Sequence, residues 1–490
     1  MSLVSLVTLA LVLVAALLYK NRSYHARRLP LPPGPRRRWL IGNLLDFPTS
    51  RPCITFRDWC REYGGLVFVD IPFKPVLIIG SFQVAKDLLD ARSNIYSDRP
   101  YFAMMDLANW GWAFSMMAYT PSFRAHRRLF IEHFNRTAMQ KYRSIQLQET
   151  HAVLVRLLHT PDMARQHLRT LPASTIMRIV YGARNASQMN EYIDIAEQAM
   201  DAVRKLLVPG AFLAEFIPFL RHFPPGCRYR PIVQRLRDQP FEEVQRTMAE
   251  GKAMPSVAYS LIRQLQGENE NLTAEQDYLA RGVAGGAYGA ASDTTTAVTE
   301  VFVVAMAMYP DVQRKAQAEL DRIVGPSRLP DFGDLESLVY IRAIMLESLR
   351  WIPTIPTCVP HAVSVDDVYE GYFIPKGTLV IPNIWAMLHN PEDYPGPETF
   401  KPERFINKEG KIDPSVRDPT TIAFGFGRRM CAGLDFAATT LHILLASMLH
   451  VYDMKPGVDE RGQPVILSGE GSDEAISYVP YFFPGESRRK

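Results

Sequence analysis

The stretch FGFGRRMCAGLDFA, residues 424–437, places a single cysteine, Cys431, among glycines and directly before an apolar segment. The residues that follow it repeat their apolar side chains with the period of a helix, so Cys431 is predicted to lie just before a helix N-terminus. The unpaired amides and the dipole of such an end lower the pKa of a thiol and favour the thiolate. Three glycines would let the backbone turn tightly and approach a flat group: Gly425, Gly427 and Gly433.

A lone cysteine can be a buried structural thiol, half of a disulfide, a nucleophile or a metal ligand, and the first role is the most common. If the loop is extended, Arg429 points the same way as the sulfur of Cys431, because residues i and i+2 share a face. A thiolate with a cation beside it suits a haem whose iron binds sulfur and whose propionate binds arginine. A nucleophilic cysteine would need a partner base, and no histidine is close to it in the sequence.

This stretch resembles the haem-binding loop of the cytochrome P-450 superfamily, whose pattern is F-x-x-G-x-R-x-C-x-G. The specified positions are filled by Phe424, Gly427, Arg429, Cys431 and Gly433. The resemblance implies that Cys431 is the axial ligand of the iron in haem b and that the other four residues hold this cofactor. The resemblance extends from about residue 30 to residue 485. The sequences of the matching segments are most similar to those of membrane-bound fungal enzymes of secondary metabolism.

Two further segments precede the cysteine loop in the order that the family has. In IMLESLRW, Glu347 and Arg350 are spaced i,i+3 and can pair on one face of a helix, and FKPERF supplies Arg404. Taken alone, this is an ordinary surface pair worth about 0.3–0.5 kcal/mol. The resemblance implies instead that the three side chains form a buried charged cluster that braces the haem loop and takes no part in the chemistry.

The segment AGGAYGAASDTTTAV combines little side-chain bulk with a polar interruption at Asp293 and Thr294. A helix start with Asp293 as N-cap, or threonines bonded back to the preceding turn, would explain the interruption without function. The segment resembles the family's A-G-x-D-T oxygen-activation motif, which implies that Thr294 and Asp293 are catalytic and deliver protons from solvent. Ala291 stands where the family usually has glycine, so a kink there can differ. The small residues through which a flat ligand could approach the helix are Gly285, Gly286, Ala287, Gly289, Ala290 and Ala291.

Two more positions are candidates for haem contacts. Near SFRAHRR the family has W-x-x-x-R on a haem propionate, and Arg127 fills the arginine position. Phe123 replaces the tryptophan and removes an N–H donor, which implies weaker haem retention or another donor in its place. His361, in CVPHAV, lies where the family often has a further propionate contact, although an ordinary core or surface histidine is nearly as good an interpretation.

The N-terminal run SLVSLVTLALVLVAALLY, residues 2–19, is uncharged and almost wholly apolar. Its 18 residues would make a helix of roughly 27 Å, close to the thickness of a bilayer core. It lacks the basic start and the A-x-A-like site of a cleaved signal peptide. Residues 20–35 are a basic and proline-rich linker, and positive charge stays on the cytosolic side. We therefore expect a single-pass anchor, by resemblance in the endoplasmic reticulum membrane, and a cytosolic haem domain over residues 36–490.

The whole chain of 490 residues carries a formal charge of +4, which is too small to indicate a nucleic-acid partner. Its five cysteines share no C-x-x-C spacing, so neither a disulfide framework nor a zinc cluster is expected. The periodicity predicts a mainly α fold with a minor β part, in one large domain because no linker follows residue 35. Strand signals lie at 65–80, 366–382 and near 475–483, and helical stretches at 82–92, 137–158, 231–250, 279–308 and 334–350.

The resemblance implies a haem-thiolate monooxygenase that inserts one oxygen atom from O2 into a lipophilic small molecule, in fungal natural-product biosynthesis. NADPH would act indirectly, through NADPH–cytochrome P-450 reductase, with cytochrome b5 as an optional second donor. An exposed basic face could dock the acidic reductase: Arg124, Arg127, Arg128, Arg428 and Arg429. By resemblance, the pocket walls come from residues 101–119, 207–220, 287–294 and 354–359.

Two alternatives stay open from the sequence. A haem-thiolate isomerase or dehydratase would rearrange a peroxide without reductase or dioxygen, and the Asp293–Thr294 pair argues against it. A membrane-anchored haem sensor or carrier would bind in the pocket without oxidising anything.

Overall fold

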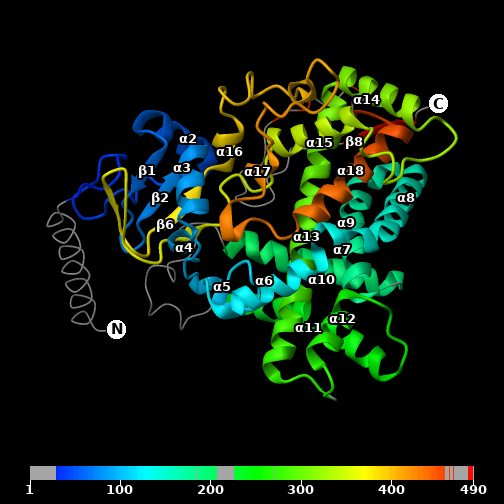
Figure 1. Ribbon diagram of the computed structural model, residues 1–490, viewed down its shortest axis with the longest axis horizontal. Helices are drawn as coiled ribbons and strands as arrows, with labels where there is room; N and C mark the ends of the chain where they lie inside the picture. Colours follow the sequence, from blue (N-terminus) through cyan, green and yellow to red (C-terminus); the bar gives the residue numbers. More distant parts are fainter. Residues whose placement is uncertain are drawn as a thin grey trace. The chain divides into compact units, whose positions relative to one another are not determined.

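A computed structural model describes residues 29–183, 185–206, 226–269, 271–457 and 484–488, with single positions 463, 467 and 469. These residues gather into two compact units, each assembled from separate stretches of chain (Figure 1). The first unit takes the described part of Met1–Pro100 with Thr357–Met387 and Phe426–Arg428. The second takes the described parts of Tyr101–Pro356, Leu388–Gly425 and Arg429–Lys490. The predicted single domain over 36–490 remains a prediction.

The first unit is built on a four-stranded sheet in the order β1-β2-β6-β3. β1 pairs antiparallel with β2, β2 pairs parallel with β6, and β3 pairs antiparallel with β6. Every residue of β1 and β2 is buried, as expected for unbroken runs of Val, Leu, Ile and Phe. The bounds are β1 Leu66–Val69, β2 Val76–Ile79, β3 His361–Ala362 and β6 Leu379–Pro382.

The predicted strands at 65–80 and 366–382 and the predicted helix at 82–92 are therefore confirmed. The other elements of the first unit are a hairpin and short helices: β4 Asp367–Tyr369, β5 Tyr372–Ile374, α2 Pro52–Tyr63, α3 Phe82–Ala85, the π-helix η1 Lys86–Ala91, and α4 Ser93–Tyr96; α16 Ile384–Leu388 follows β6.

The second unit is helical, with one small sheet in which β7 (Tyr452–Pro456) pairs with β8 (Pro484–Arg488). Its helices are α5 Ala103–Leu107, α6 Pro121–Phe134, α7 Arg136–Met139, α8 Arg143–His159, α9 Ala164–Tyr181, α10 Ala186–Leu206, α11 Arg230–Ala249, α12 Val257–Gln266, α13 Ala274–Met308, α14 Pro310–Ile323, α15 Val339–Trp351, α17 Thr420–Ala423 and α18 Leu434–Val451. Short 3-10 turns are η2 Gln140–Tyr142, η3 Pro161–Met163, η6 Gly226–Tyr229, η7 Pro402–Phe405 and η8 Gly427–Arg429. The mainly α fold with small sheets is confirmed.

The centre of the second unit is α13, a helix of 35 residues (Figure 1). Thr273 and Gln276 close a capping box at its start, which satisfies two amides that the first turn would leave unpaired. Most of its side chains are buried, because α6, α9, α10, α11 and α12 all pack against it. A helix that is apolar on nearly all sides is stable only when neighbours surround it, and here they do.

Two predicted helices differ from the structure in detail. The stretch 334–350 becomes helical only at Val339, because Asp331 and Asp334 accept hydrogen bonds from nearby backbone amides and hold turns instead. The stretch 137–158 is interrupted by the 3-10 turn η2 between α7 and α8. The predictions for 231–250 and 279–308 match α11 and α13 closely.

Within the described residues, α18 is the one helix long and apolar enough to span a membrane, with a mean hydropathy of 1.4 over its 18 residues. Just over half of it is buried, as in the core helix of a folded domain. The predicted anchor at 2–19, most of the predicted linker at 20–35, the pocket segment 207–220 and the strand signal near 475–483 lie outside the described residues.

Candidate functional site

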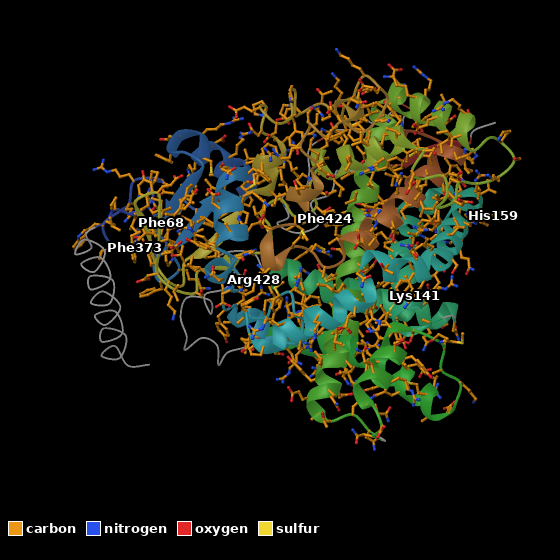
Figure 2. All side chains as sticks on the ribbon, viewed as in Figure 1. Phe68, Lys141, His159, Phe373, Phe424 and Arg428 are labelled. Atoms are coloured by element: carbon orange, nitrogen blue, oxygen red, sulfur yellow. The ribbon has the colours of Figure 1, made fainter. Side chains whose placement is uncertain are left out.

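Cys431 lies in a short loop between α17 and α18, as the sequence predicted. The Cys431 amide donates to the Phe424 carbonyl at 2.7 Å and closes the loop, whose start at Phe424 is labelled in Figure 2. Gly433 is the N-cap residue of α18, so the sulfur precedes the helix by three positions. The Cys431 side chain is accessible to solvent. A cysteine held at the start of a helix and open to solvent is positioned to bind a group from outside the chain.

In the protein without a bound group, the pKa of the Cys431 thiol is shifted in the direction opposite to that expected from a helix N-terminus. Burial among neighbouring protein atoms raises the pKa of the Cys431 thiol, and this outweighs the opposing effects of the Gly433 amide and the Arg127 charge. The sulfur is both solvent-accessible and closely surrounded, so the helix N-terminus does not by itself produce a thiolate. A metal bound to the sulfur would displace the proton and give the thiolate.

Arg429 does not extend beside the sulfur as predicted, because η8 coils this part of the loop into a 3-10 turn. Its guanidinium donates to the carbonyls of Met117 at 2.7 Å and Phe114 at 3.4 Å. The same group lies 3.7 Å from the centre of the Phe123 ring. Arg429 is buried, so it is not part of the predicted exposed basic face. Phe123, in the family's tryptophan position, packs against this cation.

Arg127 and its neighbours on α6 lie close to the cysteine loop. The Arg127 guanidinium donates to the Met430 carbonyl at 2.7 Å, directly before Cys431 in the chain. Burial lowers the pKa of Arg127, while the nearby Cys431 and Tyr119 oppose that shift. Arg124 and Arg128 are exposed on the same helix. A cation at this position is available to an anionic group held at the sulfur.

Asp293 and Thr294 lie in the middle of α13, so the interpretation of Asp293 as a helix N-cap is wrong. The Thr294 hydroxyl donates to the Ala290 carbonyl at 2.9 Å, which is the back-bonding that we considered as the non-functional alternative. The helix remains continuous through Ala291. Asp293 forms an ion pair at 2.9 Å with Arg204 of α10. No sequence signal pointed to Arg204, because 89 residues separate the two partners.

The small residues of α13 divide into two groups. A Cβ on Gly282 would lie 2.5 Å from His126 Nε2, and one on Gly285 would lie 2.9 Å from the Trp112 ring. Glycines in the first half therefore make room for protein side chains and not for a ligand, contrary to our interpretation of Gly285 and Gly286. The accessible part is 290–294, which lies between buried stretches of the same helix.

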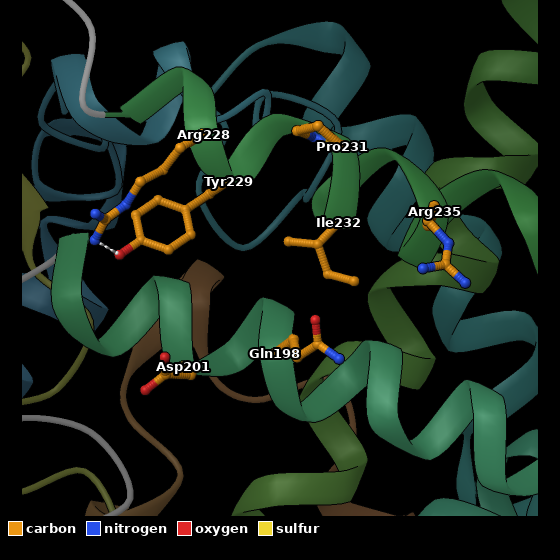
Figure 3. Close-up of a pocket in the computed structure, with 7 residues that line it drawn as sticks. All are labelled: Gln198, Asp201, Arg228, Tyr229, Pro231, Ile232 and Arg235. Carbon is orange, nitrogen blue, oxygen red and sulfur yellow. Dashed lines mark hydrogen bonds between the residues drawn. The ribbon is translucent and has the colours of Figure 1, made fainter.

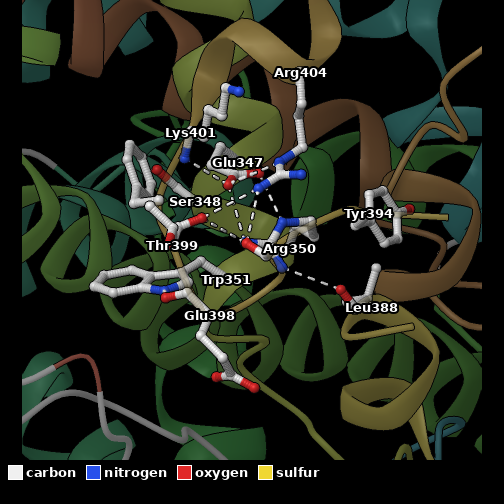
Figure 4. A network of polar contacts seen from close by, with 12 residues as sticks. Glu347, Ser348, Arg350, Trp351, Leu388, Tyr394, Glu398, Thr399, Lys401 and Arg404 are labelled. Atoms are coloured by element: carbon white, nitrogen blue, oxygen red, sulfur yellow. Dashed lines mark hydrogen bonds and ion pairs between the residues drawn. The ribbon is translucent and has the colours of Figure 1, made fainter. Parts of the chain in front are cut away.

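Glu347, Arg350 and Arg404 form a buried cluster (Figure 4). Arg350 donates to both carboxylate oxygens of Glu347, at 2.7 and 2.9 Å, and Arg404 donates at 3.2 Å. Arg350 also donates to the Leu388 carbonyl at 3.1 Å, and Arg404 to the Pro395 carbonyl at 2.8 Å. The cluster thus ties α15 to the backbone of residues 388–404. Because α15 also packs against α17, which leads into the cysteine loop, a bracing role stays the prediction.

Two predicted site residues, Gly427 and His361, belong to the first unit. Gly427 has φ +55°, and a Cβ there would lie 2.0 Å from the Leu89 carbonyl oxygen, so packing alone requires glycine. His361 is buried on β3, where its Nδ1 lies 2.8 Å from the Tyr96 carbonyl oxygen. Arg99, which the sequence analysis did not single out, donates to the carbonyls of Val359 and Pro360, both at 2.7 Å, and burial lowers its pKa to about 10. The predicted propionate contact of His361 stays a prediction.

The residues of the second unit fit a haem by their chemistry. Among the described residues, no three His, Cys, Asp or Glu side chains gather as a metal site. A metal at Cys431 therefore needs most of its ligands from a macrocycle, as haem iron has. A Cβ on Gly433 would lie at an ordinary 3.8 Å from the sulfur, so the protein alone does not demand glycine there. Arg127, which lies beside this loop, would supply a cation for a propionate, and that contact stays a prediction.

A surface pocket of about 390 Å³ lies between α10 and α11 and is not this site (Figure 3). Arg228 donates to the Tyr229 hydroxyl at its edge. It contains none of the predicted site residues, being lined by Gln198, Asp201, Arg228, Tyr229, Pro231, Ile232 and Arg235.

The comparisons with known proteins agree with this loop. The sequence matches the family described as cytochrome P450 over residues 32–468. It is 38% identical to cytochrome P450 monooxygenase 98 of Postia placenta, covering 90% of this chain and 87% of that protein. It is 36% identical to cytochrome P450 monooxygenase COX1 of Coprinopsis cinerea (94% and 92%) and 38% identical to cytochrome P450 monooxygenase ppsD of Aspergillus oryzae (91% and 87%).

Proposed function

This chain belongs to the cytochrome P450 family of oxygen-incorporating oxidoreductases, and we propose that it uses Cys431-bound haem b to insert one oxygen atom from O2 into a lipophilic small molecule. The observation that carries the proposal is the accessible sulfur of Cys431, held at the start of α18 with Arg127 beside it. Haem bound there supplies the activation of dioxygen and the oxidation of an unactivated C–H bond. The protein supplies the ligand, the protons and the dry pocket.

The accessible part of α13 would handle protons. The Thr294 hydroxyl donates its hydrogen to the Ala290 carbonyl. The hydroxyl oxygen can therefore accept a hydrogen bond from water or from an incoming group. Arg204 holds the Asp293 carboxylate through Oδ2 at 2.9 Å and would orient it for proton exchange with solvent. We therefore assign Thr294 and Asp293 to proton delivery and Arg204 to positioning Asp293.

The substrate would be a lipophilic small molecule. Within the predicted pocket segment 101–119, Trp110 and Trp112 stack at 5.4 Å and pack into the core of the second unit with Phe114. In the same segment Met116, Met117 and Tyr119 are only partly buried against this core, and apolar side chains of this kind would suit a lipophilic ligand. The similarity to enzymes of several fungi supports a role in fungal natural-product biosynthesis.

Electrons would come from NADPH through NADPH–cytochrome P-450 reductase, with cytochrome b5 as an optional second donor. The exposed Arg124 and Arg128 on α6 would attract an acidic partner toward the helix that also contacts the cysteine loop. The apolar run 2–19 and its basic linker support a single-pass anchor in the endoplasmic reticulum membrane, with residues 36–490 in the cytosol.

The test is the oxidation of added lipophilic compounds by membranes that contain the chain and a reductase. We expect NADPH consumption that depends on the substrate, with products heavier by one oxygen atom in metabolite profiles. Thr294→Ala should keep the haem spectrum and divert electrons into hydrogen peroxide. Thr170→Ala, at a half-buried back-bonded threonine on α9, is the matched control and should stay coupled.

The result that contradicts the proposal is turnover of a peroxide substrate with no electron donor and no response to NADPH, which would favour the isomerase or dehydratase alternative. Haem binding without substrate-dependent NADPH consumption would favour the sensor or carrier.

A further inference from the structure

Phe123 stands where the family has a tryptophan whose N–H group donates to a haem propionate, so position 123 of this chain cannot supply that donor. The Phe123 side chain is buried, and the centre of its ring lies 3.7 Å from the Arg429 guanidinium. An aromatic ring at this distance stabilises a cation, but it offers no hydrogen to an acceptor. If the propionate keeps a neutral donor of this kind, another residue supplies it.

Tyr119 lies four positions before Phe123, directly before Thr120, which is the N-cap residue of α6. The Tyr119 and Phe123 rings pack against each other, with 5.4 Å between their centres. Tyr119 is only partly buried against the core of the second unit. Its ring is therefore held by Phe123 while part of the side chain stays accessible. Its hydroxyl can donate one hydrogen, as the N–H group of a tryptophan does.

Three arginines of the second unit lie around Tyr119. The guanidiniums of Arg124 and Arg429 lie 5.6 and 5.8 Å from the centre of its ring. Arg127 is also near, because Tyr119 opposes the lowering of the Arg127 pKa by burial. The Tyr119 side chain thus lies where positive charge is concentrated, and such a place attracts an anionic acceptor.

The positive charge on α6 is not balanced by the described part of the chain. Arg127 donates to the Met430 carbonyl at 2.7 Å, and Arg124 packs on the Tyr119 ring. Within the described residues, neither Arg124 nor Arg127 pairs with a carboxylate. Cations that lie close together repel each other, so a bound anion would stabilise this arrangement.

The same arginines border the loop that carries the sulfur. Met430, whose carbonyl accepts from Arg127, directly precedes Cys431, and Arg429 precedes it by two positions. Haem bound at Cys431 has two propionate carboxylates at its edge. A propionate is therefore the anion whose chemistry fits these cations and the tyrosine hydroxyl among them.

We propose that the Tyr119 hydroxyl supplies the hydrogen-bond donor that Phe123 lacks, and that it donates to a haem propionate which Arg127 also binds. This inference rests on the proposed function, because it requires haem at Cys431. It gives the three side chains different parts. Phe123 packs against Arg429, Arg127 supplies charge, and Tyr119 supplies a neutral hydrogen bond that holds the cofactor.

The test is Tyr119→Phe in the full-length, haem-loaded protein, because this change removes the hydroxyl and keeps the ring. We expect haem to transfer to an excess of apomyoglobin roughly 10- to 100-fold faster than from the wild type, as for the loss of one hydrogen bond to a charged group. We also expect the propionate-bending band in the resonance Raman spectrum to shift. A side chain that only packs against Phe123 would not move that band.

Tyr259→Phe is the matched control. Tyr259 lies on α12, is half-buried like Tyr119 and packs against the same core of the second unit. Its replacement removes a hydroxyl of the same kind from a place that the proposal does not connect with haem. The control variant should keep the wild-type transfer rate and the wild-type propionate band.

The inference requires both changes in Tyr119→Phe. An unchanged transfer rate or an unchanged propionate band in this variant overturns it, and so do equal changes in Tyr259→Phe. A wild-type protein that takes up no haem contradicts the proposed function and this inference together. Both expected changes in Tyr119→Phe, in a protein that shows no substrate-dependent NADPH consumption, support the inference and contradict only the proposed function.

Discussion

Glu347 is a fully buried carboxylate on which donors from two parts of the chain converge. Arg350 lies one turn away on α15, while Arg404 and the Lys401 amide come from the segment around η7. A buried ion pair is stabilising only when the remaining hydrogen-bonding positions are also satisfied. Here the backbone carbonyls of Leu388 and Pro395 take further N–H groups of the two arginines. The cluster therefore holds together because several elements contribute to it.

Arg350→Leu should destabilise the haem-loaded protein by about 3–5 kcal/mol, because it leaves the Glu347 charge buried with only part of its compensation. The matched control is Arg314→Leu, which breaks an exposed i,i+3 pair with Asp311 and should change stability by less than about 1 kcal/mol. Urea unfolding measures both. A loss for Arg350→Leu as small as that of the control would mean that the cluster does not stabilise the fold.

At the scale of single residues, the sequence spacing predicted which charged side chains pair, but it did not predict the other groups that surround the site residues. The i,i+3 step placed Glu347 and Arg350 on one face, and the motif order led to Arg404. The pKa of Cys431 could not be predicted in the same way, because it depends on protein atoms from segments far away in the sequence. For the same reason, the backbone partners of Arg429 at Phe114 and Met117 were not foreseen.

Among the elements, α13 depends on glycine where neighbours come closest. Gly282→Ala should destabilise the protein by about 1–3 kcal/mol, because the new methyl group would overlap the buried His126 ring and approach the Trp112 carbonyl oxygen. Gly289→Ala is the control on the same helix, where the methyl group would meet only Leu236 at an ordinary 3.6 Å. It should stabilise by up to about 1 kcal/mol through helix propensity. Thermal unfolding that ranks the two variants the other way would contradict this packing.

α18 contributes a dependence of stability on pH. Burial, helped by the positive charge of Arg342, lowers the pKa of His442 from 6.5 to about 4. His442 therefore binds a proton near pH 6.5 in the unfolded chain, but only near pH 4 in the folded protein. Stability falls as the pH falls through this window, by at most about 3 kcal/mol for this group.

The measurement is the free energy of unfolding of the haem-loaded protein between pH 7 and pH 4. His442→Gln should flatten the slope, and His159→Gln, exposed at the end of α8, should leave it as it is. An unchanged slope in His442→Gln would show that this side chain does not titrate as described.

The sequence predicted where the helices lie, but it did not predict which helices and side chains pack against each other. The apolar repeat located α11 to within one residue at each end and the end of α13 at Met308, although α13 begins five residues earlier than predicted. The Asp331 and Asp334 turns delayed α15, because side-chain bonds to the backbone compete with a helix. Glycines in α13 suggested space for a ligand, but their neighbours Trp112 and His126 fill it. The Arg204–Asp293 pair depends on how α10 packs against α13, which no local pattern specifies.

In the whole molecule, we expect membrane anchoring and catalysis to depend on different segments of the chain. Deleting residues 1–20 should weaken membrane attachment and leave the haem spectrum unchanged, because no site residue lies in that segment. Sedimentation of membranes measures attachment, and a variant with residues 21–28 replaced by a neutral linker is the control for the linker charge. A full-length protein that is soluble without detergent would contradict the anchor.

The central claim is that the sulfur of Cys431 binds haem iron. Its most direct test is the absorption spectrum of the reduced, carbon-monoxide-bound protein, in which thiolate ligation gives the long-wavelength band for which the family is named. We predict this band for the wild type and for Cys60→Ser, whose thiol has its pKa raised to about 12 by burial. Cys431→Ser should lose the band. A band of unchanged position and intensity in Cys431→Ser would contradict the account.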